Sequence, residues 1–213
     1  MQTMKNLALL CLLLLSTSAL AQHPAADGAG FVPLFNGKDL TGWKTTGNWL
    51  VEPDGSISLH PREGEKGWQR YAAYLSTEKQ YGDFVLDLEF KINAKGNSGV
   101  FMRVGDLKDH VKSGFEVQIL DTYGLAKPGH HDCGGIVHGT GPSKNMVKPA
   151  SEWNRYTITV QGRSVKVVFN GEQVIDTTLE AMNMADRPNL GHIGFQDEAL
   201  RVWYRNVRIK EMK

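Results

Sequence analysis

The sequence predicts an all-β fold of one domain, arranged as a two-sheet sandwich or jelly roll. Many short segments alternate apolar and polar residues with a period of two, which is typical of strands that bury one face. Turn-forming residues separate these segments roughly every eight to twelve positions, as in β-sandwiches. No long stretch shows the periodicity of an amphipathic helix.

The first half of the chain contains a predicted hairpin and one long predicted strand. Asn48–Glu52 and Ser56–His60 flank a Pro-Asp-Gly turn at residues 53–55, in which proline presets φ and glycine permits a positive φ. In Phe84–Lys91 apolar residues alternate with mainly charged ones. We therefore expect a strand there with one apolar and one charged face.

The second half of the chain shows the same pattern. Asn170-Gly171 predicts a tight hairpin turn, and Leu179–Ala185 is a predicted short helix. Asp121–Ser151, rich in glycine, proline and histidine, is a predicted long loop, and such loops in compact domains are usually functional or mobile. The remaining predicted strands are Val100–Val104, Phe115–Leu120, Tyr156–Val160, Val165–Phe169, Gln173–Thr177, Gly191–Phe195 and Val202–Ile209.

The N-terminus has the pattern of a cleavable secretory signal. Lys5 precedes an apolar run from Leu7 to Leu15, and small residues lead to a cleavage position after Ala21. The alternative, a membrane anchor, needs a longer apolar run to cross a hydrocarbon core of ~30 Å. We expect a signal peptide over residues 1–21, a flexible leader over 22–30 and the domain over 31–213, in a periplasmic or secreted protein without a stable membrane span.

Charge and cysteine content exclude several classes of partner and chemistry. The formal net charge is +1, and no basic stripe is present, which argues against nucleic acid partners. Of the two cysteines, Cys11 would leave with the signal peptide. Cys133 would then be alone in the mature chain, which excludes an intramolecular disulfide. It is a poor candidate nucleophile, because no partner residue is evident and an oxidising compartment penalises free reactive thiols.

The strand Phe115–Leu120 carries the first candidate catalytic residues. Glu116 and Gln118 alternate with apolar residues, so they share the polar face of the strand. A bulge near its end would bring Asp121 onto the same face. Two carboxylates on one strand resemble the catalytic pair of β-sandwich glucanases. An ordinary solvent-facing strand is the alternative interpretation.

Two more charged residues are expected near this strand. Alternation in residues 97–103 places Arg103 on the same face as Phe101, where its guanidinium would hold a sugar oxygen or pair with Glu116. Glu89, on the charged face of its own strand, would join that surface if the strands are neighbours. Ordinary surface charge is the other interpretation of Glu89.

Histidines of the long loop are the next candidates. His131 and His138 are expected to act in a cleft as a general base or as hydrogen-bond donors, because histidine titrates near neutrality. The spacing of His130, His131 and His138 gives little support to a zinc site, since adjacent histidines on a strand point apart. No phosphate-binding glycine loop is present. No cofactor is therefore expected, and a metal ion stays unsupported.

Several motifs, in order along the chain, resemble one protein family. They are residues 34–43 (LFNGKDLTGW), 89–91 (EFK), 97–103 (NSGVFMR), 116–121 (EVQILD), 153–154 (WN), 170–171 (NG), 191–196 (GHIGFQ) and 204–209 (YRNVRI). Over Phe31–Lys213 the chain resembles the bacterial 3-keto-disaccharide hydrolase family. The resemblance implies a concanavalin- or laminarinase-like jelly-roll β-sandwich, usually exported, acting on glycosides whose C3 hydroxyl is oxidised to a ketone.

The chemistry implied by this resemblance assigns a role to each candidate residue. A C3 ketone acidifies the proton at C2, so base-catalysed elimination expels the C1 substituent and hydration completes a net hydrolysis. This needs a base, a donor to the enolate and an acid. We assign the base to Glu116, the enolate contact to Arg103 with help from Gln118, and the acid to Asp121 or a loop histidine such as His131. The predicted substrate-binding residues are Glu89, Gln118, Trp68, Tyr123, His138 and Lys144.

One departure from the family pattern bears on the site. Where relatives often have Gln-Asp-His-Gly, residues 196–199 read Gln-Asp-Glu-Ala, so Glu198 or another residue would take over any role of that histidine. Two other functions stay open: a non-catalytic carbohydrate-binding module, since fold does not fix function, and a conventional glycosidase. The expected partner is a small oxidised sugar or glycoside.

Overall fold

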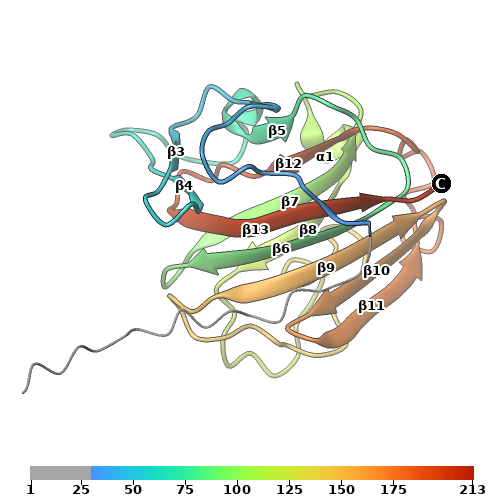
Figure 1. Cartoon of the computed structure of the whole chain (residues 1–213). Coiled ribbons are helices and arrows are strands. Elements are labelled where there is room, and N and C mark those ends of the chain that lie inside the picture. Colours follow the sequence, from blue (N-terminus) through green and yellow to red (C-terminus); the bar gives the residue numbers. More distant parts are fainter. Residues whose placement is uncertain (1–29) are drawn as a thin grey trace, which may run out of the picture.

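The computed structural model describes residues 30–213 and arranges them as two stacked antiparallel sheets (Figure 1). The predicted signal peptide, and the predicted leader except Gly30, lie outside the described residues. The strands are β1 (Val32–Pro33), β2 (Trp43–Lys44), β3 (Trp49–Val51), β4 (Ile57–Leu59), β5 (Leu75–Thr77), β6 (Phe84–Ile92), β7 (Asn97–Val104), β8 (Phe115–Leu120), β9 (Asn154–Gln161), β10 (Ser164–Phe169), β11 (Glu172–Thr178), β12 (His192–Phe195) and β13 (Val202–Glu211).

The order of strands in the sheets differs from their order in the chain. The eight-stranded sheet runs β11-β10-β9-β6-β13-β4-β3, with β1 also paired to β13, and the five-stranded sheet runs β2-β5-β12-β7-β8. Neighbours such as β6 and β13 are far apart in sequence, as in a jelly roll. The predicted all-β, jelly-roll sandwich is confirmed, and Figure 1 shows its two layers.

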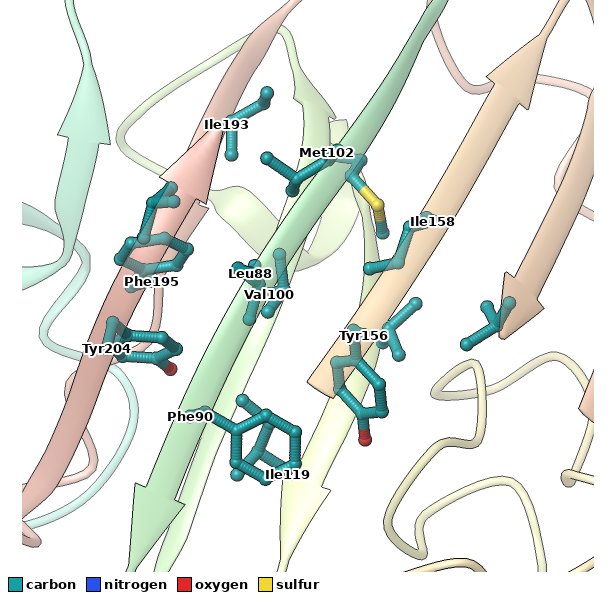
Figure 2. Close-up of a cluster of buried hydrophobic side chains, with 14 of the residues drawn as sticks. Leu88, Phe90, Val100, Met102, Ile119, Tyr156, Ile158, Ile193, Phe195 and Tyr204 are labelled. Atoms are coloured by element: carbon teal, nitrogen blue, oxygen red, sulfur yellow. The ribbon is translucent and has the colours of Figure 1, made fainter. Parts of the chain in front are cut away.

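A continuous apolar core fills the space between the two sheets (Figure 2). Leu88 and Phe90 of β6 are fully buried in it, as the period-two pattern of that strand predicts. Phe195 of β12 stacks on Tyr204 of β13 with 4.0 Å between ring centroids, so an aromatic contact joins the sheets. The core fixes which face of each strand is turned outward.

Every strand predicted from the alternating pattern is present, with ends that differ by a few residues. The Asn170-Gly171 turn is confirmed by positive φ values of 50° and 91°. The strands β1, β2 and β5 were not predicted, because they have only two or three residues and, unlike β3 and β4, do not flank a marked turn.

The predicted helix Leu179–Ala185 is wrong, because this segment forms successive turns. The N–H of Met184 donates to the carbonyl of Leu179 at 2.7 Å, and Asn183 has a φ of 58°, which interrupts a right-handed helix. The helical segments of the described chain are instead the 3-10 turn η1 (Tyr71–Ala73) and α1 (His110–Ser113). Neither is long enough to cross a membrane.

The predicted loop Asp121–Ser151 contains no named strand and is tied to β8 through its backbone. The N–H of Gln118 donates to Gly135 at 2.8 Å, and its carbonyl accepts from Gly134 at 3.0 Å. The N–H of Val137 donates to the carbonyl of Glu116 at 3.1 Å. The middle of the loop therefore lies along the free edge of β8.

Cys133 helps to hold this loop against the core. Its side chain is fully buried, and its Sγ lies 3.3 Å from the hydroxyl of Tyr156. Burial raises the pKa of the Cys133 thiol to about 11. The thiol is therefore protonated at neutral pH and unsuited to nucleophilic attack, as expected from the sequence.

Candidate active site

Glu116 is the central residue of the candidate site. Its neighbours Phe115 and Val117 on β8 enter the core, so its carboxyl points to the outer face of the five-stranded sheet. Glu116 is only 5% exposed, and within residues 30–213 its Oε1 is buried without a hydrogen-bond partner. Burial, and to a lesser extent the charge of Glu198, raises the pKa of Glu116 well above its usual value. Such a carboxyl is suited to general acid–base catalysis.

Gly99 of β7 provides the space that this carboxyl occupies. A Cβ atom built on Gly99 would lie 1.8 Å from Oε1 and 2.7 Å from Cδ of Glu116. No other residue fits at this position unless the carboxyl moves. The close approach of backbone to carboxyl is therefore part of the site.

Replacing Gly99 by alanine is expected to displace the Glu116 carboxyl and to destabilise the fold by about 1–3 kcal/mol, the usual cost of overpacking a filled site. Gly82→Ala is a matched control, because its added Cβ would meet nothing closer than 3.6 Å. Urea unfolding of both variants measures the difference. Equal stabilities would contradict the close contact at Gly99.

Aromatic side chains cover the sheet beside Glu116. Phe101 pairs with Glu116 across β7 and β8. His110 from α1 packs against Tyr74, with 4.7 Å between ring centroids, and against Phe101, with 5.6 Å. The Nε2 of His110 lies 3.0 Å from Ser76 Oγ, and burial lowers the pKa of His110 to about 4. This side of the site is therefore apolar and uncharged at neutral pH, which explains the desolvation of Glu116.

Two amide side chains lie on either side of Gly99. Gln118 of β8 pairs with Gly99, and its Oε1 accepts from the N–H of Ile119 at 2.9 Å. Gln196, directly after β12, donates its backbone N–H to the carbonyl of Gly99 at 2.9 Å. In the described chain the Oε1 of Gln196 is buried without a partner. The site thus offers amide groups to a bound polar molecule.

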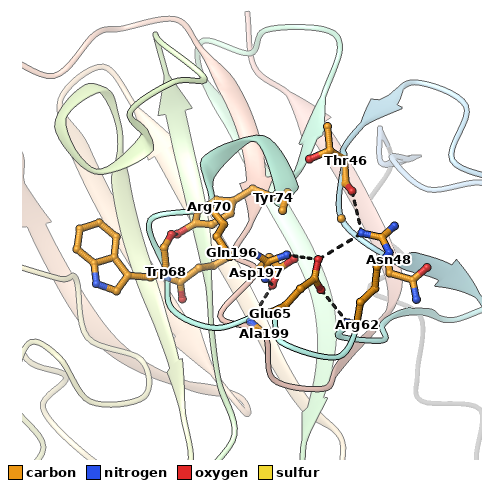
Figure 3. Close-up of polar contacts among 12 residues, drawn as sticks. Thr46, Asn48, Arg62, Glu65, Trp68, Arg70, Tyr74, Gln196, Asp197 and Ala199 are labelled. Carbon is orange, nitrogen blue, oxygen red and sulfur yellow. Dashed lines mark hydrogen bonds and ion pairs between the residues drawn. The ribbon is translucent and has the colours of Figure 1, made fainter.

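A buried ion pair holds the segment that follows Gln196 (Figure 3). Asp197 is fully buried, and its Oδ1 accepts from Arg70 at 2.9 Å and from the N–H of Ala199 at 2.7 Å. Arg70 also contacts Glu65 Oε1 at 2.6 Å. Burial raises the pKa of Asp197, and burial together with Asp197 raises the pKa of Glu198. Glu198 is therefore a second carboxyl of the site with a raised pKa.

A surface depression of about 420 Å³ opens beside Arg70 and Tyr71. Its lining also includes Glu65 and Lys108 but not Glu116. The candidate site is thus defined by its buried polar atoms and not by this depression.

Arg103 does not face Glu116, so its assignment as the enolate contact is wrong. The β7–β12 register shifts between His192 and Gly194, and Arg103 has a φ of 50°, which breaks the alternation assumed from the sequence. Its guanidinium is fully buried and donates to the carbonyl of Gly82 at 2.9 Å. It also binds the carboxylate of Asp83 at 2.7 Å. Arg103 therefore has a structural role.

Asp121 does not join the polar face of β8, because the expected bulge is absent. The β7–β8 register runs from Asn97–Leu120 to Met102–Phe115 without a shift. Asp121 Oδ2 instead accepts from the N–H of Lys95 at 2.8 Å and so fixes the turn between β6 and β7. Its assignment as the acid is not supported by this position.

Glu89 lies on the opposite side of the sandwich from Glu116. The alternate residues of β6 enter the core, so Glu89 points to the outer face of the eight-stranded sheet. Its Oε2 accepts from Arg205 Nε at 2.6 Å and from Asn206 at 2.7 Å. The expectation that Glu89 shares a surface with Glu116 is wrong.

The other predicted substrate-binding residues lie in two loops. Trp68 is 39% exposed and packs edge-on against Tyr71 at 6.0 Å, beside the aromatic group of the site. Tyr123, 62% exposed, and Lys144 belong to the β8–β9 loop. Lys144 Nζ lies 3.5 Å from Glu172 at the edge strand β11. Substrate contact by these residues stays a prediction.

The structure brings the three loop histidines together. The Nδ1 or Nε2 atoms of His130, His131 and His138 lie within 4.8 Å of one another. Burial, and then the neighbouring histidines, lower the pKa of His131. The assumption that adjacent histidines point apart is wrong here, because His130 and His131 lie in a turn and not on a strand.

Sequence reasoning missed Tyr74, His110 and Arg70 altogether. Each lies outside a strand, so no alternation marks the side chain as part of the site. The segment with Gln196 was noticed only through its match to, and its departure from, motifs of a resembling family. Its contact with Gly99 depends on strand order, which a single sequence does not reveal.

Residues 30–210 match the profile of a family described as the 3-keto-alpha-glucoside-1,2-lyase-like domain. A protein of Bacteroides thetaiotaomicron named 3-keto-disaccharide hydrolase is 25% identical over 230 aligned positions, which cover 86% of this chain and 79% of that protein.

Solved structures resemble the fold as well. A Parabacteroides distasonis protein, provisionally described as a glycosyl hydrolase, superposes with a TM-score of 0.74 at 27% identity, covering 86% of this chain and 95% of that one. A β-glucanase of Bacillus licheniformis superposes with a TM-score of 0.51 at 15% identity, covering 88% of this chain and 100% of that one. The latter similarity concerns the fold alone.

Proposed function

This chain belongs to the family of 3-keto-alpha-glucoside-1,2-lyase-like domains, and from that premise we propose that it cleaves glycosides carrying a ketone at C3. The name of the Bacteroides thetaiotaomicron relative, 3-keto-disaccharide hydrolase, supports a keto-disaccharide as substrate. In the proposed reaction, elimination across C1 and C2 precedes the addition of water.

The observation that carries this proposal is the buried carboxyl of Glu116. Its Oε1 lacks a partner within the described chain, and the pKa of the group is raised. A base that removes a proton from carbon works best when its pKa approaches the operating pH. Desolvation supplies this shift, and within the described chain the unpartnered Oε1 is not committed to any hydrogen bond.

The proposed chemistry begins at C2. Glu116 removes the C2 proton, and the electron pair moves onto the C3 oxygen as an enolate. The enolate returns to the ketone as the C1–C2 double bond forms and the bond from C1 to the leaving oxygen breaks. Glu198 donates a proton to that oxygen. Water then adds to C1 while a proton returns to C2, which gives the hydrolysed keto-sugar.

The two carboxyls are electrostatically coupled, so they divide the base and acid roles between them, and the reactive form is the one ionised at Glu116 and protonated at Glu198. Burial raises the pKa of both Glu116 and Glu198, and the charge of Glu198 further raises that of Glu116. A pair of this kind titrates as a unit, so one proton is held over the pH range between its two steps. In this proposal the side-chain amides of Gln118 and Gln196 donate hydrogen bonds to the enolate oxygen.

Incubating the purified protein with a 3-keto-glucoside and with the unoxidised glucoside tests this proposal. The keto-sugar alone should be cleaved, and in D₂O its product should carry deuterium at C2 beyond a protein-free control. No turnover across a panel of keto-glycosides would refute the proposal. Tight binding without turnover would identify a binding module, and cleavage of the plain glycoside would identify a conventional glycosidase.

The pH dependence of kcat/KM should rise and then fall. Below the raised pKa of the base the carboxyl is protonated and inactive, so activity climbs as pH rises through a pKa well above the usual 4.5 of a glutamate side chain. Activity falls again when the acid loses its proton. A profile measured between about pH 4 and 9 checks this. A flat profile over that range would contradict a carboxyl base.

We further propose that residues 1–21 direct export, so that the reaction takes place in the periplasm or outside the cell. Mass spectrometry of the protein recovered from the periplasm or medium should find a chain beginning at Gln22. A full-length chain confined to the cytoplasm would refute the export of this protein.

A further inference from the structure

Three histidines of the β8–β9 loop form an exposed cluster. The centroids of the His130 and His131 rings lie 4.4 Å apart, and those of His131 and His138 lie 4.9 Å apart. One ring nitrogen of each residue falls within 4.8 Å of the others. Three imidazoles so close together repel one another when protonated, and no described contact makes this arrangement part of the core.

The backbone that carries the cluster is held in place. Around His130 and His131, the N–H of Gly129 donates to Asp132 Oδ2 at 2.6 Å, and the N–H of Asp132 donates back to the carbonyl of Gly129 at 3.1 Å. Directly before His138, the N–H of Val137 donates to the carbonyl of Glu116 on β8 at 3.1 Å. The histidines therefore project from a braced loop, which limits the entropy lost when they bind a ligand together.

We propose that His130, His131 and His138 bind a divalent transition-metal ion, of which Zn²⁺ suits three neutral imidazoles well. Nitrogens that bind Zn²⁺ at about 2.0–2.1 Å in tetrahedral geometry lie roughly 3.4 Å apart. The three exposed rings reach that spacing by small rotations about their side-chain bonds. Three protein ligands leave the fourth position open to water or to a ligand, as in catalytic zinc sites.

Binding of the metal ion would affect one hydrogen bond that the metal-free protein forms within the cluster. The N–H of His138 donates to Nδ1 of His130 at 3.1 Å, so the metal either takes this lone pair or selects the other tautomer. The displaced N–H is exposed and can bond to water instead. The site does not depend on the proposed reaction at Glu116, and its test requires no substrate.

Calorimetric titration of the tag-free, chelator-treated protein with Zn²⁺ alone tests the proposal. We expect one ion bound per chain. His131→Ala and His138→Asn should each weaken binding by about 100-fold or more, because even outer partners of metal ligands are worth 10–100-fold. Asparagine is chosen at position 138 because His138 has a φ of 62°, which asparagine tolerates.

His192→Gln serves as the matched control, because it removes an imidazole outside the cluster and should leave binding unchanged. Visible absorption of bound Co²⁺ gives a second readout, since the band intensity distinguishes tetrahedral from octahedral nitrogen ligation. No binding to the folded wild-type protein would overturn the proposal. Equal binding by the wild type and both cluster variants would overturn it too, by placing the ion elsewhere.

Discussion

Replacing Glu116 by glutamine is expected to lower kcat/KM on a 3-keto-glycoside by about 10²- to 10⁴-fold, the usual contribution of a general base. The amide keeps the shape of the side chain over Gly99 but cannot accept the C2 proton. Initial rates across a range of keto-glycoside concentrations measure the effect. The rise of activity with pH should disappear in the variant.

The loss should not come from unfolding. A carboxyl whose folded pKa lies above its unfolded value contributes stability below the unfolded pKa and loses it as pH rises through the folded pKa. Ionised Glu116 therefore opposes folding at high pH, and the glutamine variant should be at least as stable as the wild type there. Glu172→Gln, an exposed carboxyl on β11, is the control that should keep full activity. Full activity in the Glu116 variant would refute its role as base.

Replacing Arg103 by methionine is expected to destabilise the protein by about 2–3 kcal/mol, because breaking a buried ion pair leaves its partners unsatisfied. The change removes donors to the carbonyls of Gly82 and Gly162, at 2.9 and 2.6 Å, and to Asp83. Asp83 retains some contact with water, since its side chain is 38% exposed, which keeps the cost at the lower end of the range for such pairs. Chemical unfolding at neutral pH measures the loss.

A surface arginine gives the matched comparison. Arg201→Met removes an ion pair to Glu52 at 3.2 Å whose arginine side chain is 43% exposed, and exposed pairs contribute only about 0–1 kcal/mol. The folded fraction of the Arg103 variant, assayed at low temperature, should retain its activity on keto-glycosides. A stable Arg103 variant without activity would contradict the structural role and would support a catalytic role for this residue.

The sequence predicted the strands and the polar face of β8 because both follow from a period of two. Glu116 and Gln118 point outward, as expected, since their neighbours need burial. The same rule failed at Arg103, where a local register shift turns the side chain away. The alternation of residues along one strand cannot reveal a bulge, because a bulge arises from the pairing with another strand.

The unknown order of the strands in the sheets was the second limit on predicting the site from the sequence. Glu89 was placed near Glu116 on the assumption that their strands are neighbours, but β6 and β8 belong to different sheets. The histidine cluster was missed for a related reason. Its three side chains meet because of a turn, and no periodic pattern in the sequence marks that turn. Pairing between distant segments, and not local preference, decides which polar residues meet.

The three hydrogen bonds of Arg103 reach from the five-stranded sheet to segments that border strands of the other sheet. Gly82 and Asp83 precede β6, and Gly162 lies between β9 and β10. They form a polar cross-link between the two sheets, and Cys133 is the free, buried cysteine of the described residues, so this link is not covalent. Assembly of the two sheets then needs no thiol oxidase, and reducing agents should leave the folded domain intact.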